Sequence, residues 1–442
     1  MFRKLLILSF TIGLSVVTCV SNEVLILTSL IESGKIAEAQ QKSRVSPDIN
    51  GVKSYTGFLT VDKDCGNNLF FWFFPAEVNW ENAPVLLWLT GGPGTSSCYG
   101  LFAEVGPFRW KNNTKELIEN KNRWTKDFNV IFLDQPVGTG FSYTERNCYA
   151  KTNKEIAKQV YSALVQFFHL FPNLRKNSFS LVGDSYAGTY QTAIGREIDE
   201  RNCDSKVKIN LKGVLLGNPY LDLSCLSYAS NWYEAGFIEE DSRDRIVKYQ
   251  GIRNKYIQEK NSEKANEYEN KIWNEEFSQI GLPSMFNYLY DEEITMGFKH
   301  FVTDEKTRKL LKVGNTKYNV TSYFGTVAKV LEPELIVSAI PNVKYLLDKN
   351  YLVAFYTGQL DVQCIYSSLN CVLDQLNHAE YQKAKRKKWY VDGRLAGWVR
   401  QGSNLMSVVV RDAGHVVPVD QGEAALALAK GCLGSDKLDL QK

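Results

Sequence analysis

The chain has 442 residues, a length that predicts two or three domains or one large α/β unit with insertions. Apolar residues make up 44% and charged residues 23%, which is ordinary for a globular protein and excludes wholesale disorder or a fibrous structure. The formal net charge of +3 is too small to indicate nucleic acid or an anionic membrane as partner. Only four histidines are present, which argues against a histidine-rich metal site.

The first residues predict export. A basic start at Arg3 and Lys4 precedes apolar residues up to Val17, and Cys19 and Ser21 are small enough to flank a cleavage site. We expect a secretory signal peptide over residues 1–21, with an N-terminal membrane anchor as the alternative that the short apolar stretch disfavours. No later segment has an apolar run of roughly 18 residues, so no integral membrane segment is expected in the mature chain. An extracellular or lysosomal (vacuolar) destination follows.

Cysteine usage agrees with a secretory protein. Nine cysteines occur, and removal of Cys19 with the signal leaves an even number, so disulfide bonds are expected although their pairing cannot be deduced. No two cysteines form a C-x-x-C pair, which argues against zinc ribbons and thioredoxin-type redox chemistry. Two N-x-[ST] sequons predict glycosylation at Asn112 and Asn319.

The chain after the signal alternates between strands and helices. Residues 22–50 are interpreted as an N-terminal arm or a propeptide. Short apolar runs bounded by turn residues then predict strands that are buried on both faces, and helical spacing of apolar residues predicts helices between them. The alternation predicts a mainly parallel sheet with helices on both faces. The expected strands cover residues 54–61, 69–74, 85–89, 129–134, 179–183 and 213–217, and the expected helices cover 154–171 and 187–201.

The alternation stops near residue 223. Residues 239–312 are charged and rich in Asn, and their spacing predicts helices over 244–260 and 263–277. We expect a helical cap insertion over 223–340 that divides the core into a first part, 51–222, and a second part, 341–442. The second part contains strand patterns at 351–356 and 405–410 and a closing helix over 422–429. A basic tract at 383–388 is interpreted as a solvated helix face, with a proteolytic cleavage site as the alternative.

Ser185 is the candidate nucleophile. It lies in Gly183-Asp184-Ser185-Tyr186-Ala187-Gly188, between a predicted buried strand and a predicted helix, which is the arrangement of a nucleophile elbow. Small residues let such a turn close, and the helix N-terminus stabilises developing negative charge. Ala187 departs from the G-x-S-x-G pattern, so an ordinary strand-to-helix turn is the alternative.

A serine nucleophile needs a general base, and His415 is the best candidate of the four histidines. His169 falls within a predicted helix, where it is expected to pack, and His300 and His378 lie among charged residues, as surface histidines do. His415 follows the strand at 405–410, and Asp361 has the equivalent place after the strand at 351–356. Their order along the chain, serine then Asp361 then His415, is that of α/β-hydrolases.

The glycine-rich loop at 90–94 is the candidate oxyanion hole. It ends an early strand, and the backbone N–H groups of Gly92 and Tyr186 are the expected donors to an oxyanion. A phosphate-binding loop is the alternative, but the Walker spacing and its lysine are absent.

The motifs together resemble the serine carboxypeptidase family. They occur in the family's order from about residue 50 onward, and the text at 54–61 and 69–76 is similar to the vitellogenic-like carboxypeptidase branch. The motifs are GGPGTSS, FLDQPVGTGFSY, GDSYAG, GQLDVQC and GHVVPVDQ. The resemblance implies an α/β-hydrolase fold with a mainly parallel central sheet, flanking helices and a cap. It also implies a serine-type carboxypeptidase that acts on peptide or protein C-termini through an acyl-enzyme, without metal or organic cofactor.

The resemblance also implies a binding site for the substrate's free carboxylate. The family's residues for this role fall on Thr90, Gly91, Glu104 and Asp184, and the two acids are expected to share a proton, which favours acidic conditions. Thr90 replaces an Asn of the family and Asp184 replaces a Glu. This combination is also similar to the acyltransferase branch of serine carboxypeptidase-like proteins, which is one alternative function. A secreted binding or stabilising protein without turnover is the other.

Overall fold

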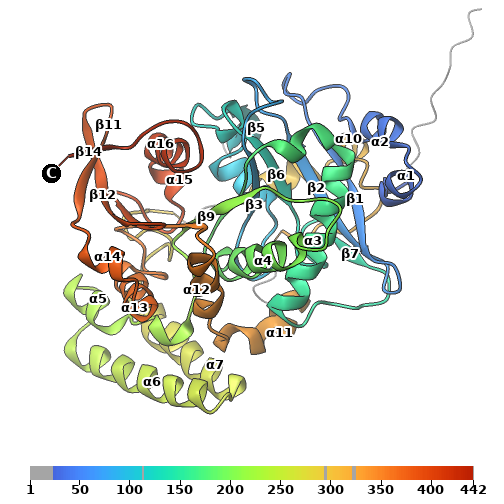
Figure 1. The fold of residues 1–442 in the computed structure, drawn as a ribbon. Helices are drawn as coiled ribbons and strands as arrows, with labels where there is room; N and C mark the ends of the chain where they lie inside the picture. Colours follow the sequence, from blue (N-terminus) through green and yellow to red (C-terminus); the bar gives the residue numbers. More distant parts are fainter. Residues whose placement is uncertain (1–22, 112–113, 293–295, 321–324, 442) are drawn as a thin grey trace, which may run out of the picture.

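One large sheet organises the molecule. The computed structural model describes residues 23–111, 114–292, 296–320 and 325–441, so the predicted signal peptide lies outside the described residues. The sheet has 12 strands, in the spatial order β1-β2-β6-β3-β8-β9-β10-β13-β12-β11-β14, with β7 paired to β2 (Figure 1). A separate hairpin pairs β4 (Phe108–Lys111) with β5 (Glu116–Glu119).

The strands are parallel in the middle of the sheet and antiparallel at its edges. Every pair from β6 to β13 is parallel, whereas β1, β2 and β7 at one edge and β12, β11 and β14 at the other run antiparallel to their neighbours. The predicted parallel sheet is therefore confirmed for the centre. The strands are β1 (Tyr55–Asp62), β2 (Asn67–Phe74), β3 (Val85–Leu89), β6 (Asn129–Leu133), β7 (Tyr143–Thr144), β8 (Phe179–Asp184), β9 (Leu211–Gly217), β10 (Leu352–Gly358), β11 (Lys387–Val391), β12 (Arg394–Gly402), β13 (Leu405–Val410) and β14 (Asp439–Gln441).

Two hydrophobic cores lie on opposite faces of the sheet. Successive side chains of a strand point to opposite faces, so Phe71 and Phe73 of β2 belong to one core while Trp72 and Phe74 belong to the other. Helices α3 (Asn153–Leu170), α4 (Ala187–Asn202), α12 (Ile340–Asp348) and α13 (Tyr366–Leu376) contribute to the first core. Helix α16 (Gly422–Leu433) and the π-helix η1 (Gly100–Glu104) contribute to the second. The continuous apolar runs of the central strands follow from burial on both faces.

The segment between β9 and β10 forms helices in its described part. An aromatic cluster with Tyr228, Trp232 and Trp273 packs its first helices together, and α6 and α7 lie side by side at the edge of the molecule (Figure 1). Its α- and π-helices before α12 are α5 (Ala229–Glu234), α6 (Glu240–Gln258), α7 (Ser262–Lys271), the π-helix η5 (Ile272–Phe277), α8 (Ser278–Ile280), α9 (Phe298–Thr303), α10 (Glu305–Leu311) and α11 (Thr326–Leu331), and the 3-10 helix η6 (Glu332–Ile336) follows α11.

The N-terminal arm is packed into the body of the protein. It carries α1 (Thr28–Glu32) and α2 (Ile36–Ser43), and its residues Leu27, Ala39 and Val45 are fully inaccessible to solvent. The backbone of Leu27 donates a hydrogen bond to Phe58 O of β1 at 2.9 Å. A segment that contributes core side chains and sheet contacts is a structural part of the folded chain.

Two disulfides join distant parts of the chain. Cys65 bonds Cys148, and Cys225 in the turn η4 (Leu223–Cys225) bonds Cys371 of α13. The other described cysteines are Cys98, Cys203, Cys364 and Cys432, which are not bridged. Of the two sequons, Asn112 lies outside the described residues and Asn319 has an exposed side chain. Within the described ranges, no helix has the length and apolar character needed to cross a membrane.

The interpretation of the basic tract at 383–388 as a helix face is wrong. Helix α14 (Ala379–Lys383) ends where the tract begins, and Lys387 and Lys388 open strand β11. The tract is thus a turn followed by a strand near the sheet edge. Antiparallel pairing with β12 holds the second half of the tract in a strand. A polar edge strand has no continuous apolar run, so the sequence alone did not indicate it.

Candidate active site

Ser185 occupies a strained turn at the carboxyl end of β8. Its φ is +58°, a backbone conformation that residues other than glycine rarely adopt and that functional turns often keep. The turn closes tightly: a Cβ on Gly183 would come within 2.1 Å of Leu89 O, and one on Gly188 within 2.8 Å of Pro219 Cβ. Helix α4 begins two residues after the serine. This is the geometry of a nucleophile elbow.

His415 and Asp361 form a buried hydrogen-bonded pair. The His415 Nδ1 to Asp361 Oδ2 distance is 2.8 Å, and solvent reaches 2% of the histidine and 3% of the aspartate. Asp361 follows β10 and His415 follows β13, so both side chains come from carboxyl ends of central parallel strands, as Ser185 does. The structure therefore brings together the three residues that the sequence singles out. Burial lowers the pKa of His415, but the charge and hydrogen bond of Asp361, with the charge of Asp184, raise it above its ordinary value overall.

Asn218 fixes the Asp361 carboxylate and was not singled out from the sequence. Its Nδ2 donates to Asp361 Oδ2 at 2.5 Å, and the N–H of Gln363 donates to Oδ1 at 2.8 Å. Asn218 is fully buried and directly follows β9. Its place in the sequence could have identified it, because each of the neighbouring strands β8, β9 and β10 is followed within a few residues by a polar side chain of the site.

Ser185 and His415 line one small cleft, about 330 Å³ of empty space, together with the glycine-rich loop. A Cβ on Gly91 would lie 2.5 Å from Tyr186 N and 2.8 Å from Ser185 Cβ, so the loop contacts the elbow backbone directly. Gly92 has a φ of +113°, which glycine adopts without strain. The two expected oxyanion donors, Gly92 and Tyr186, are thus on adjoining backbone segments beside Ser185.

Asp134 anchors the glycine-rich loop from below. One carboxylate oxygen accepts from Ser96 Oγ at 2.7 Å and from Ser97 N at 3.0 Å, and the other accepts from Phe141 N at 2.9 Å. Burial raises its pKa to about 6, against the lowering effect of these hydrogen bonds. The sequence analysis quoted this residue in a motif without a role, and the structure shows it tying two loops together.

Glu104 and Asp184 form a second pair of buried acids beside the cleft. Within the described part of the chain, neither oxygen of Glu104 and not Oδ1 of Asp184 has a hydrogen-bond partner. Burial, and then the charge of Asp184, raise the pKa of Glu104 well above its usual value, although Arg109 lowers it. Burial also raises the pKa of Asp184 to about 6, while His415 and the N–H of Gly91 lower it. Two such carboxyl groups cannot both ionise cheaply.

Thr90 completes the set of predicted carboxylate-binding residues. Its Oγ1 accepts a hydrogen bond from Trp88 Nε1 at 3.2 Å. A hydroxyl that accepts from the indole keeps its own proton available for donation. Thr90 and Gly91 line the cleft with Asp184, whereas Glu104 lies in η1, where the charge of Asp184 helps to raise its pKa.

An irregular strap, residues 286–290 between β9 and β10, covers the candidate catalytic histidine. The sequence analysis did not single out this strap. The Phe286 ring stacks on the His415 ring with centroids 5.6 Å apart, and His415 N donates to Phe286 O at 2.5 Å. Asn287 and Tyr290 bind the two oxygens of Asp420, whose Oδ2 also accepts from Gly414 N at 2.7 Å. No sequence pattern marks this irregular segment, because its contacts depend on tertiary structure alone.

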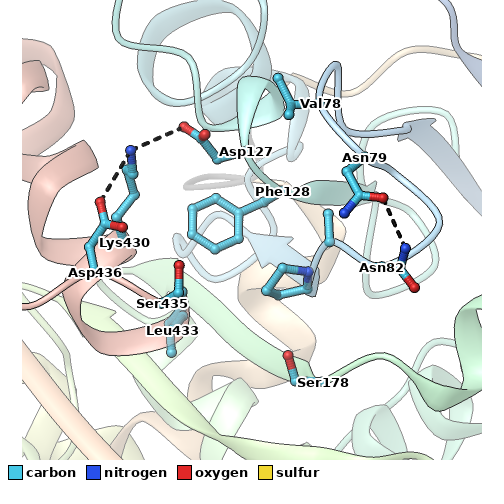
Figure 2. Close-up of a pocket in the computed structure, with 13 residues that line it drawn as sticks. Val78, Asn79, Asn82, Asp127, Phe128, Ser178, Lys430, Leu433, Ser435 and Asp436 are labelled. Atoms are coloured by element: carbon cyan, nitrogen blue, oxygen red, sulfur yellow. Dashed lines mark hydrogen bonds and ion pairs between the residues drawn. The ribbon is translucent and has the colours of Figure 1, made fainter.

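A larger cavity lies at the opposite end of the strands. It is bordered by Pro84, Phe128 and Ser178, which precede β3, β6 and β8, and encloses about 900 Å³ (Figure 2). Lys430 lies between Asp127 and Asp436 at 3.8 and 3.2 Å. No histidine lines this cavity, and its lysine is ion-paired, so it does not offer the nucleophile and base of the smaller cleft.

The sheet, the elbow serine and the His–Asp pair define an α/β-hydrolase. The family model described as serine carboxypeptidase matches residues 46–435. The chain therefore belongs to the serine carboxypeptidase family, a family of serine-type peptide hydrolases, as the motifs predicted.

Curated relatives match over most of their length. The venom serine carboxypeptidase of Apis mellifera is 37% identical over 91% of this chain and 89% of the relative. The vitellogenic carboxypeptidase of Aedes aegypti is 36% identical over 91% and 88%, and the human probable serine carboxypeptidase CPVL is 36% identical over 91% and 87%. The solved structure of Kex1(delta)p, a prohormone-processing carboxypeptidase from Saccharomyces cerevisiae, has a TM-score of 0.75 at 21% identity, over 88% of this chain and 95% of that one, and confirms the fold.

Proposed function

We propose that the protein releases C-terminal residues from peptides, with Ser185 as nucleophile, His415 as general base and acid, and Asp361 as the residue that orients the imidazole. The observation that carries this proposal is the 2.8 Å His415–Asp361 bond in the same site as a serine of positive φ. Ser185 Oγ attacks the last peptide carbonyl while His415 takes its proton and then gives it to the leaving amine. Water hydrolyses the acyl-enzyme by the same proton transfers in reverse.

The backbone around the serine supplies electrostatic stabilisation in this proposal. The N–H groups of Gly92 and Tyr186 donate to the oxyanion of the tetrahedral intermediate, where preorganised donors in a site shielded from water are most effective. Asp361 accepts the Nδ1 proton of His415, so the lone pair at Nε2 is left for the Ser185 proton. Asn218 keeps the carboxylate in place for that task.

Selection of a free C-terminus is assigned to Thr90, Gly91, Glu104 and Asp184. A protonated carboxyl group donates a hydrogen bond to a carboxylate, and an ionised one repels it. The raised pKa values of Glu104 and Asp184 keep at least one proton on the pair in mildly acidic solution. The proposed enzyme therefore binds its substrate best in acid.

An origin in the secretory pathway is part of the proposal. The signal-like N-terminus, the two disulfides and relatives that include a venom protein support it. Exposed Asn319 is available for a glycan, and Asn112 carries the second sequon.

Mass spectrometry of peptide products tests the function. N-terminally blocked peptides with free and with amidated C-termini are incubated with the mature protein from about pH 4 to about pH 7. Stepwise loss from the free-acid peptides alone, fastest in acid, is the expected result. No loss while Ser185 still reacts with a fluorophosphonate probe would favour the acyltransferase, which Thr90 and Asp184 suggest. No labelling of Ser185 would favour a binding protein without turnover.

A further inference from the structure

A cluster of cationic side chains lies near one edge of the sheet, at β11. Four strands, β9, β10, β13 and β12, separate it from β8, which Ser185 follows. We call it the edge patch: Lys383 at the end of α14, Lys385 and Arg386 in the following turn, and Lys387 and Lys388 at the start of β11. All five residues are exposed. The strands β12 and β11 follow β13 toward the edge, where Figure 1 shows α14 below β12 and α16 beside β11. The small net charge of the whole chain, +3, gives no indication of this local excess of positive charge.

Most of these cations have no anionic partner. Lys383 pairs with Glu380 at 3.2 Å, but the other four form no ion pair with any described residue. Lys264 and Lys271 of the cap differ in this respect, because both bind Glu267, at 2.7 and 3.1 Å. One acid, Asp439 of β14, lies opposite Tyr390 on the flank of the patch. The edge patch is therefore a surface of uncompensated charge, unlike the charged but internally paired cap helices.

A pocket of about 480 Å³ adjoins the edge patch and contains no carboxylate in its wall. Its floor is one face of β12 and β13, with Arg400 opposite Ser407, and its walls include Tyr366 and Arg386. Arg400 is held in place by Ala384 O at 3.0 Å and Gln382 O at 2.6 Å. These bonds occupy two of its five N–H donors, which leaves others for a ligand.

Aromatic rings stand beside the cations of this pocket. The Arg386 guanidinium lies 5.0 Å from the centroid of Trp398 and 5.7 Å from that of Tyr366, and the Arg400 guanidinium lies 4.6 Å from that of Tyr381. Contact with these rings favours the cationic groups at this position, and guanidinium groups bind tetrahedral oxyanions through two parallel hydrogen bonds.

We propose that the pocket and the edge patch bind a sulfated polysaccharide. One sulfate enters the pocket between Arg386 and Arg400, where the Ser407 hydroxyl lies on the floor, and Lys385, Lys387 and Lys388 contact further sulfates along the chain. A membrane surface fits less well, because none of the large apolar side chains that are exposed among the described residues lies in the patch. The patch is separate from the cleft at Ser185, so a bound polysaccharide holds the enzyme without covering its active site.

Heparin binding tests the proposal. The test variant is K385Q/R386Q/K387Q/K388Q, and the matched control is K248Q/K255Q/K264Q/K271Q, which removes the same charge from the cap. We expect the wild-type protein and the control to bind heparin at about 0.15 M salt and the test variant to bind at least about tenfold more weakly. Circular dichroism and thermal unfolding report the fold of each variant. Equal loss in both variants, or no loss in the test variant, would overturn the proposal.

Two further measurements use the unaltered protein. Acylation of lysines by an amine-reactive reagent, read by mass spectrometry, should fall at Lys385, Lys387 and Lys388 when heparin is present and stay unchanged at Lys248 and Lys255. The same assay with desulfated heparin, duplex DNA and phosphatidylserine vesicles identifies the ligand class. Protection by heparin alone supports a sulfated glycan, whereas equal or stronger protection by desulfated heparin, DNA or vesicles would contradict it.

Discussion

Two buried acids of the active site, Asp361 and Glu104, differ in their hydrogen bonding. Asp361 has its carboxylate oxygens bound by His415, Asn218 and the N–H of Gln363. Glu104 is equally buried, yet neither of its oxygens has a partner among the described residues. The first arrangement suits a residue that holds a neighbour in one orientation. The second suits a residue whose partner is a ligand.

The energetic consequences of the two arrangements also differ. An unpartnered buried polar group costs about 1–3 kcal/mol, so the Glu104 site lowers the stability of the free protein. A bound carboxylate that shares the proton of the pair recovers part of that cost. Ligand binding cannot recover free energy at Asp361 in this way, because the hydrogen bonds of its carboxylate are already made. Substitutions at Asp361 should therefore change turnover, and substitutions at Glu104 should change substrate binding and its pH dependence.

The largest expected effect is that of Ser185→Ala. Loss of the nucleophile should reduce kcat by a factor on the order of 10⁶, because Ser185 is the residue of the cleft that occupies the elbow between β8 and α4. The thermal unfolding temperature should change little, because alanine and serine have the same backbone strain at this positive φ. Release of C-terminal residues and fluorophosphonate labelling are the measurements. Turnover at the wild-type rate would reject the assignment of Ser185.

Asp361→Asn should reduce kcat by a factor on the order of 10⁴. An asparagine amide can donate to His415 Nδ1, which moves the imidazole proton to Nε2 and leaves no lone pair for Ser185. The shape of the side chain is kept, so KM for blocked dipeptides should remain close to that of the wild type. A large rise in KM with unchanged kcat would place Asp361 in substrate binding instead.

Asn218→Gly removes the donor to Asp361 while glycine accepts the positive φ of 39°. A hydrogen bond to a charged group contributes about 1.5–3 kcal/mol, so kcat should fall by roughly 10- to 100-fold. Asn350→Gly is the matched control, because Asn350 has a φ of +62° and is exposed. Steady-state kinetics of both variants decide the matter: equal effects would mean that backbone change, and not the lost donor, explains the result.

The sequence predicted the centre of this molecule better than its edges. The strand at 85–89 coincides with β3 because a strand buried on both faces must be a continuous apolar run. Strand β11 was not predicted, because Lys387 and Lys388 face solvent and its pairing with β12 decides the conformation. Likewise Ser185, Asp361 and His415 were found as residues that follow strands. Phe286 belongs to an irregular strap, and only the tertiary fold brings it to His415.

Glu104→Gln should flatten the pH dependence of substrate binding. In the wild type, Asp184 ionises near pH 6, so KM should rise by up to about tenfold per pH unit above that value, because the pair loses the first of its two protons and the new charge repels the substrate carboxylate. A glutamine amide donates to a carboxylate at every pH, so the rise in KM between about pH 5 and about pH 7.5 should be smaller in the variant.

Thermal unfolding provides an independent test of the same substitution. The pKa of Glu104 is higher in the folded protein than in the unfolded chain, so ionisation favours unfolding and wild-type stability falls as pH rises above about 4.3. Glu104→Gln removes this loss and should raise the unfolding temperature at about pH 7.5 more than at about pH 4.5. Identical pH profiles of KM and unfolding temperature in the two proteins would exclude the shared proton.

Thr90→Val should have the smallest effect. The substitution keeps the shape of the side chain but removes the hydroxyl that is available to the substrate carboxylate, and a neutral hydrogen bond contributes about 0.5–1.5 kcal/mol. We therefore expect KM to rise by roughly 2- to 10-fold with kcat nearly unchanged. Thr90→Ser keeps the hydroxyl and serves as the control, with KM close to that of the wild type. If serine impairs binding as much as valine does, the lost hydroxyl alone does not explain the effect, and the assignment of the Thr90 hydroxyl to the substrate carboxylate fails.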